Sequence, residues 1–393
     1  MPSRLADAFR AHPVHLQPKH LHDFTSLKEL PDSYKWASDE DQYRAQPDPA
    51  HHEPVPVVDL SDPNALEEIG HACRRWGVFQ VVNHGVPTTV LDRMENVAKG
   101  FFSLPAHQKL KAARSPDGIS GYGLARISSF FPKLMWSEGF TMVGSPLEHF
   151  QRVWPHDYTQ FCDAVEEYDK QMQKLAQTLM WLMLGSLGIT KEDLNWANNS
   201  NSTTTTTPRG GPKKEVAAGS SSAAIQLNHY PACPDPDRAM GLAPHTDSTL
   251  LTILHQSNTS GLQVLRDDGA RWVTVPPIRG GLVVHIGDLL HILSNGLCPS
   301  VVHRAVVNRD RNRISIAYLH GPPSNVRISP VQKLVGPSQP PLYRAVTWNE
   351  YLGTKAKHFN KALSSVRLCA AAPINGLVDA KDQKNNNNAV KVG

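Results

Sequence analysis

The sequence predicts an α+β protein with a double-stranded β-helix (jelly-roll) core, an N-terminal region of mixed helices and strands, and a long supporting helix. Residues 225–320 consist of short β-type segments separated by turns, which is typical of a sandwich or jelly-roll. Residues 159–184 repeat apolar side chains at alternating spacings of 4 and 3, the pattern of an amphipathic helix. A helix packed across a sheet fits this stripe better than a coiled coil. A helical region followed by an all-β region is typical of an α+β chain.

The N-terminal elements follow from local patterns. The apolar run at 55–60 predicts a short strand, and Asp62 followed by Pro63 predicts the start of a helix that ends near Arg75. Residues 77–86 predict a buried strand, and a further helix is expected from Thr88 to about Phe102.

The predicted core contains six strands, with a hairpin turn at Asp267–Ala270. The expected strands are 225–230, 262–265, 272–275, 282–286, 300–307 and 314–319.

Changes in composition divide the chain into regions. The low-complexity stretch and the tail are too polar to bury a core, so we expect both to be flexible. The expected regions are an arm (1–50), a mixed α/β region with the long helix (51–197), a flexible insertion (198–224), the jelly-roll core (225–330), a C-terminal helical segment (331–378) and a disordered tail (379–393).

The overall composition is ordinary for a soluble globular protein. Of 393 residues, 40% are hydrophobic and 19% charged, and the net charge of +4 argues for neither a nucleic-acid nor a membrane partner. The five cysteines are odd in number and form no CxxC pair, which suits free thiols in a reducing compartment. With no signal peptide or membrane span visible, we expect a cytoplasmic protein.

His245, Asp247 and His303 carry the strongest chemical signal. His245 and Asp247 are two residues apart, so they face the same side of an extended segment, and His303 follows on a predicted strand. Two imidazoles and one carboxylate can hold Fe(II) on one face and leave other positions open. Alone, the His245/Asp247 pair could be a loop hydrogen bond. The combination with His303 and a following arginine favours a metal site.

Arg313 and Ser315 also share one face of a strand. A guanidinium and a hydroxyl pointing together can bind one carboxylate of a dicarboxylic keto acid. Asn228 and Tyr230 repeat this spacing on an earlier strand and could add hydrogen bonds. An internal salt bridge is the alternative for Arg313, since a buried arginine needs an anion.

These motifs resemble a known family, the plant 2-oxoglutarate- and Fe(II)-dependent dioxygenases. The matching segments are Asn228–Pro231, His245–Asp247, His303–Arg304, Arg313–Ser315 and Trp76–Gly85, and the resemblance spans about residues 55–355. The chain departs from the family at the insertion before Asn228 and at His229, where Tyr is frequent.

Within that family, residues 134–141 and Gly121–Gly123 resemble the gibberellin 3β-hydroxylases. The resemblance implies hydroxylation of a gibberellin precursor at C-3β, giving a bioactive gibberellin, succinate and CO2. It also implies Fe(II) on His245, Asp247 and His303. 2-Oxoglutarate and O2 would be co-substrates and ascorbate a supporting reductant. The expected partner is a diterpenoid small molecule, and the enzyme is expected to be a monomer.

A gibberellin precursor is a rigid, mostly apolar acid, so its pocket needs apolar walls and one cation. Phe130, Phe131, Trp136 and Phe140 are candidate wall residues, and Arg126 or Lys133 could supply the cation. Core packing is the alternative for Trp136 and Phe140.

Three other functions remain open at this point. The chain could be another oxidase of the same family, acting on a different gibberellin carbon or on a flavonoid. It could be a cupin-like protein that binds metal and ligand without turnover. It could also be a hydrolytic zinc enzyme, because two His and one Asp can hold zinc.

Overall fold

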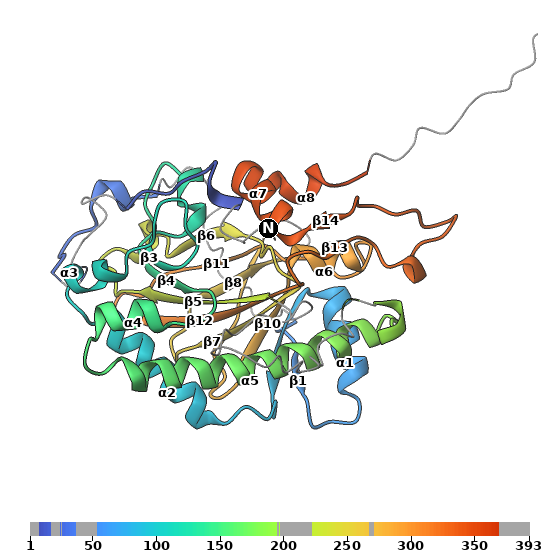
Figure 1. Ribbon diagram of the computed structural model, residues 1–393, viewed down its shortest axis with the longest axis horizontal. Coiled ribbons are helices and arrows are strands. Elements are labelled where there is room, and N and C mark those ends of the chain that lie inside the picture. The colour runs from blue at the N-terminus through green and yellow to red at the C-terminus, as the bar shows by residue number, and fades with distance from the viewer. Residues whose placement is uncertain are drawn as a thin grey trace, which may run out of the picture.

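The computed structural model describes residues 8–16, 24, 26–36, 53–194, 196, 222–266 and 271–368. The predicted turn at 267–270, most of the predicted insertion and the predicted tail lie outside these residues. Figure 1 shows the long helix α5 running along a large sheet, with a second sheet beyond it.

The helices and strands have the following bounds. The α-helices are α1 (Ala65–Arg75), α2 (Thr88–Phe102), α3 (Ala106–Lys109), α4 (Leu147–Val153), α5 (Tyr158–Gly185), α6 (Asp288–Leu293), α7 (Trp348–His358) and α8 (Ala362–Ser365). The strands are β1 (Val57–Asp59), β2 (Val78–Val82), β3 (Gly121–Gly123), β4 (Glu138–Met142), β5 (Ser222–Tyr230), β6 (Leu242–His245), β7 (Leu251–Gln256), β8 (Leu262–Leu265), β9 (Trp272–Thr274), β10 (Leu282–Ile286), β11 (His303–Ala305), β12 (Arg313–Gly321), β13 (Arg327–Ile328) and β14 (Val346–Thr347). A short 3-10 helix, η6, covers Arg126–Phe130.

Two sheets form the core. The larger has eight strands in the order β1-β2-β10-β7-β12-β5-β4-β3, and the smaller has four in the order β6-β11-β8-β9. The large sheet therefore combines β1–β4 with strands of the predicted jelly-roll core. Helices α2 and α5 pack against β12 and cover one face of the large sheet. The opposite face of the sheet is available to carry the site.

The predicted helices at 159–184 and at 88–102 are confirmed as α5 and α2. In α5 the buried side chains include Tyr168, Met172 and Leu175, which lie on the stripe that the sequence pattern predicted. This stripe joins the main hydrophobic cluster with residues of α2 and of the large sheet. The long helix thus supports the sheet that carries part of the site.

Several predicted boundaries are wrong, and two of them have a clear local reason. Helix α1 begins at Ala65 rather than at Pro63, because the Asp62 carboxylate accepts a hydrogen bond from the Asn64 N–H (2.7 Å) and forms a turn before the helix. Strand β5 begins at Ser222, inside the predicted insertion, because β12 continues to Gly321 and offers it paired backbone groups.

Candidate active site

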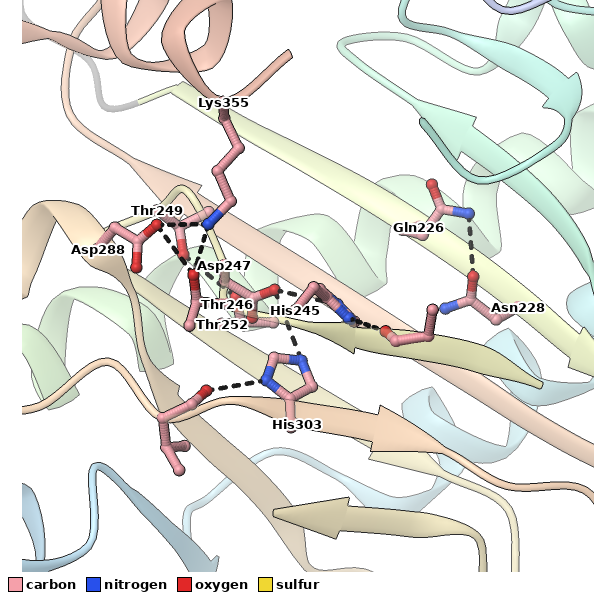
Figure 2. Close-up of polar contacts among 12 residues, drawn as sticks. Gln226, Asn228, His245, Thr246, Asp247, Thr249, Thr252, Asp288, His303 and Lys355 are labelled. Atoms are coloured by element: carbon pink, nitrogen blue, oxygen red, sulfur yellow. Dashed lines mark hydrogen bonds and ion pairs between the residues drawn. The ribbon is translucent and has the colours of Figure 1, made fainter. Parts of the chain in front are cut away.

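The two histidines and the aspartate of the sequence motif come together at the edge of the small sheet. His245 ends β6 and pairs directly with His303, which begins β11. The Nε2 atoms of both histidines lie 3.7 Å from Oδ1 of Asp247. One ligand atom from each residue lies within 4.8 Å of the others, and Figure 2 shows the three side chains converging.

Backbone carbonyls fix the orientation of both imidazoles. Nδ1 of His245 lies 2.8 Å from the Ala243 carbonyl oxygen, and Nδ1 of His303 lies 3.2 Å from that of Val301. Because a carbonyl can only accept, each Nδ1 donates, and each Nε2 keeps its lone pair toward Asp247. This is the tautomer that a metal ligand requires.

The three groups hold the charge states that a divalent metal needs. Burial lowers the pKa of His245 and of His303 to about 4, so both imidazoles are neutral at pH 7. Burial raises the pKa of Asp247, but His303 and His245 outweigh it and lower the value to about 2. Two neutral nitrogens and one carboxylate oxygen on one face fit Fe(II).

The four residues expected to bind a keto acid lie on one face of β5 and β12. Arg313 pairs with Tyr230, and Ser315 pairs with Asn228 in the antiparallel register. Because directly paired residues point to the same side of a sheet, all four side chains face together. All four line the cavity that also contains the metal motif.

Arg313 is buried without an anionic partner in the part of the chain that the structure describes. Its side chain donates from Nη2 to Gln256 Oε1 (3.0 Å) and lies over the Tyr230 ring, while its Nε has no acceptor. Gly261 makes room for it, since a Cβ there would lie 2.8 Å from Cδ of Arg313. The internal salt bridge considered for Arg313 is therefore absent from the described residues, and the arginine remains able to bind a carboxylate.

A second polar network joins the loop that carries Thr246 and Asp247 to α7. Lys355 of α7 donates to Asp288 Oδ2 (2.8 Å) and to the Thr246 hydroxyl, and Thr246 also donates to Asp288 (3.1 Å). Tyr351 donates to the same carboxylate oxygen (2.8 Å), and Figure 2 shows Lys355 reaching down to this group. No sequence pattern predicted this network, because its members lie on segments about 40 to 110 residues apart and share no motif.

The metal motif and the four residues expected to bind a keto acid line one cavity of about 270 Å³. Its walls come from the two sheets, the η6 segment, α7 and the N-terminal residues Phe9 and His12. Of the six residues proposed as substrate contacts, only Arg126 and Phe130 lie in these walls. Gln226, Thr141 and Arg114 also line the cavity and were not predicted.

The other four proposed contacts lie outside the cavity walls, which corrects the prediction. Trp136 is fully buried and packs edge-on against Phe24 and Tyr34. Phe140 stacks on Phe101 in the main core, because strand alternation turns it away when its neighbour Thr141 faces the cavity.

Phe131 and Lys133 also point elsewhere. Phe131 packs against Trp36 and Phe359, and Lys133 donates to the Asp32 carbonyl oxygen (3.0 Å). Of the two cations proposed to bind the substrate, only Arg126 therefore faces the cavity.

Comparisons with known proteins agree with this geometry. The model of the 2OG-Fe(II) oxygenase superfamily matches residues 221–322, and that of the non-haem dioxygenase N-terminal region, described from morphine synthesis, matches residues 55–159. Gibberellin 3-beta-dioxygenase 1 of Pisum sativum is 62% identical over the whole of both chains. This chain belongs to the gibberellin 3-beta-dioxygenase family of 2OG-Fe(II) oxygenases. The enzyme is thus a 2-oxoglutarate-dependent dioxygenase that uses Fe(II) and O2, rather than a zinc hydrolase or a cupin-like binding protein.

Other relatives extend this result. Gibberellin 3-beta-dioxygenase 1 of Arabidopsis thaliana is 57% identical over 93% of the enzyme and 99% of that protein. Among solved structures, JOX2 in complex with 2OG, Fe and JA is 30% identical, with a TM-score of 0.72 over 88% of the enzyme and 95% of that chain. The expected jelly-roll oxygenase fold is confirmed. Among the described residues, no helix is long and apolar enough to span a membrane.

Proposed function

We propose that the enzyme hydroxylates a gibberellin precursor at C-3β, forming succinate and CO2 from 2-oxoglutarate. The observation that carries this proposal is the 62% identity, over full length, to a protein named gibberellin 3-beta-dioxygenase. The cavity supports it, because apolar side chains such as Ile119, Ile127 and Leu352 share its walls with the metal motif. A rigid apolar acid of modest size suits such a site.

His245, Asp247 and His303 are the proposed Fe(II) ligands. With 2-oxoglutarate and O2, the bound metal supplies the oxidation of an unactivated C–H bond. The protein holds both Nε2 atoms in the unprotonated form through the Ala243 and Val301 carbonyls. The backbone of Asp247 is held by the Asp288 N–H, which donates to the Asp247 carbonyl oxygen (2.7 Å).

Arg313 and Ser315 are proposed to bind the far carboxylate of 2-oxoglutarate. The buried guanidinium has an unused Nε donor, and a carboxylate would satisfy it with a charge-assisted hydrogen bond. Tyr230 pairs with Arg313 across β5 and β12, lies under its guanidinium and offers a third donor. Asn228 accepts from Gln226 Nε2 (3.1 Å), so its own amide N–H groups remain for the ligand.

Product analysis tests this proposal directly. Purified enzyme is incubated with Fe(II), ascorbate, 2-oxoglutarate and a panel of gibberellin precursors, and the products are identified by mass spectrometry and by comparison with 3β-hydroxylated standards. We expect one new hydroxyl at C-3β and one succinate for each product molecule. Hydroxylation only at another carbon, or only of a flavonoid in a parallel reaction, would contradict the proposal.

We further propose that the enzyme acts as a cytoplasmic monomer. The four cysteines that the structure describes are free and buried, which suits a reducing compartment. Among the described residues, the exposed large apolar side chains lie at scattered positions, as on many monomers, namely Val57, Leu66, Phe130, Leu147 and Leu368. Light scattering that gave twice the mass of one 43.3 kDa chain would contradict the monomer.

A further inference from the structure

Two arginines line the cavity wall, namely Arg126, which the sequence offered as a candidate cation, and Arg114, which it did not. Arg126 begins η6, Arg114 lies on the segment before β3, and both line the cavity. Arg114 uses one Nη2 donor on the Leu124 carbonyl, and Arg126 donates from Nη1 to the Pro116 carbonyl (2.8 Å). Each guanidinium is thus held in place by backbone oxygens, while its charge remains uncompensated by these neutral partners.

Arg126 also has donors without acceptors. Its Nε and Nη2 atoms are buried and have no hydrogen-bond partner within the described parts of the chain. Asp117 is near enough to favour the charged form of Arg126, but no carboxylate of the described residues comes within 4.0 Å of either guanidinium. A buried cationic donor without an acceptor is costly, so this arrangement is expected to receive an anion when the cavity is filled.

The two charges also repel each other. Burial lowers the pKa of Arg114 to about 9, and the neighbouring charge of Arg126 adds to the shift. Both side chains are therefore cationic at pH 7 and close enough to interact. An anion between them would offset this repulsion.

The surroundings define the anion further. Ile127 and Phe130 lie on η6 with Arg126, Ile119 also lines the cavity, and the centre of the Phe9 ring lies 4.6 Å from the Arg126 guanidinium carbon. Such walls suit a carboxylate on an apolar body better than a small hydrated ion. 2-Oxoglutarate has a separate candidate anchor at Arg313, on β12 of the large sheet.

We propose that Arg126, supported by Arg114, binds the carboxylate of the substrate and thereby determines which carbon faces the metal. This inference rests on the proposed function, because it requires an acidic, apolar substrate. It identifies Arg126 as a specificity-determining residue that has no contact with the metal or with 2-oxoglutarate.

The test removes the charge from Arg126 with Arg126→Gln and measures substrate binding separately from turnover. In anaerobic enzyme loaded with Fe(II) and 2-oxoglutarate, we expect the dissociation constant of the gibberellin precursor to rise about 20- to 100-fold, the effect of losing a charged hydrogen-bonding partner. The dissociation constant of 2-oxoglutarate should stay within about twofold, since Arg313 would be untouched. Lys133→Gln is the matched control, because it removes a nearby positive charge outside the cavity walls and should leave both constants unchanged.

A substrate ester separates the carboxylate contact from general damage. The methyl ester of the precursor lacks the anionic charge, so wild-type enzyme and Arg126→Gln should bind it with nearly equal affinity. Equal losses for acid and ester, or no loss for either, would overturn the inference. If the unaltered enzyme hydroxylates no gibberellin precursor, the proposed function itself fails, which is a distinct result. Arg114→Gln, with an expected smaller loss confined to the acid, keeps the test informative if Arg126→Gln folds poorly.

Discussion

The two ends of the cavity are built differently. The metal end comprises His245, Asp247, His303, Arg313 and Ser315, which lie in or directly beside strands. The substrate end comprises Arg114, Arg126, Phe130, Phe9 and Leu352, which lie on loops, on η6, on the N-terminal segment and on α7. In the first group, the position of each residue in or beside a strand determines which way its side chain points, because side chains alternate between the two faces of a strand. In the second group, contacts between distant segments determine the side-chain positions. We therefore expect the chemistry to depend on the sheets and the choice of substrate to depend on the segments that cover them.

Asp247→Ala should have the largest effect. It removes the only carboxylate of the proposed metal site among the described residues, so turnover should fall below detection and Fe(II) should bind far more weakly. Metal content after dialysis and succinate release are the measurements. Asp117→Ala, which removes a carboxylate near the substrate end, should retain both. Wild-type succinate release by Asp247→Ala would show that the metal end lies elsewhere.

Arg313→Leu should raise the KM for 2-oxoglutarate about 100-fold, because a buried charge-assisted contact is lost. The dissociation constant of the substrate, measured at saturating 2-oxoglutarate, should change little. Combined with Arg126→Gln, this variant tests whether the two ends act separately. Equal effects of Arg313→Leu on both ligands would contradict the division of the cavity into two ends.

Lys355→Met tests the contact between α7, which borders the substrate end, and Asp288 and Thr246 beside the metal end. Asp288 is fully buried, and removing its cationic partner should lower the free energy of unfolding by about 3 kcal/mol, the cost of an uncompensated buried charge. Urea unfolding of the metal-free protein gives this value. The double variant Lys355→Met/Asp288→Asn should recover most of the loss, since the unpaired charge is gone. A single variant as stable as the unaltered chain would show that the ion pair does not stabilise the α7 contact.

Acid should destabilise the folded protein through its buried histidines, of which His285 lines the cavity and His320 does not. Burial lowers the pKa of His285 and of His320 to about 4, so the folded protein keeps these imidazoles neutral where the unfolded chain, with values near 6.5, takes up protons. The free energy of unfolding should therefore fall as the pH drops from about 6.5 to about 4. His320→Gln should flatten this dependence in urea titrations of the metal-free protein. An unchanged slope in that variant would mean that His320 does not contribute to it. The arginines of the substrate end stay charged throughout this range.

The sequence predicted the metal end of the cavity better than the substrate end. The motif residues His245, Asp247 and His303 converge because each side chain's direction follows from its position in or next to a strand. Trp136 and Phe140 were misplaced as wall residues because sequence proximity to a subgroup motif does not say which side of β4 a residue faces, or that Phe24 and Tyr34 would cover Trp136. Side-chain alternation along β4 could have predicted that Phe140 and Thr141 face opposite sides of the sheet. In contrast, no local sequence pattern predicts the contact between Lys355 and Asp288.

The contact of Lys355 with Asp288 and Thr246 also has a consequence for synthesis. During translation the ribosome makes Asp288 and the two sheets well before it makes α7. Until Lys355 leaves the ribosome, the Asp288 carboxylate lacks the cation that it pairs with in the folded protein. The loop that carries Thr246 and Asp247 completes these contacts only once α7 has emerged, so we expect iron loading to be a late event in the maturation of the enzyme.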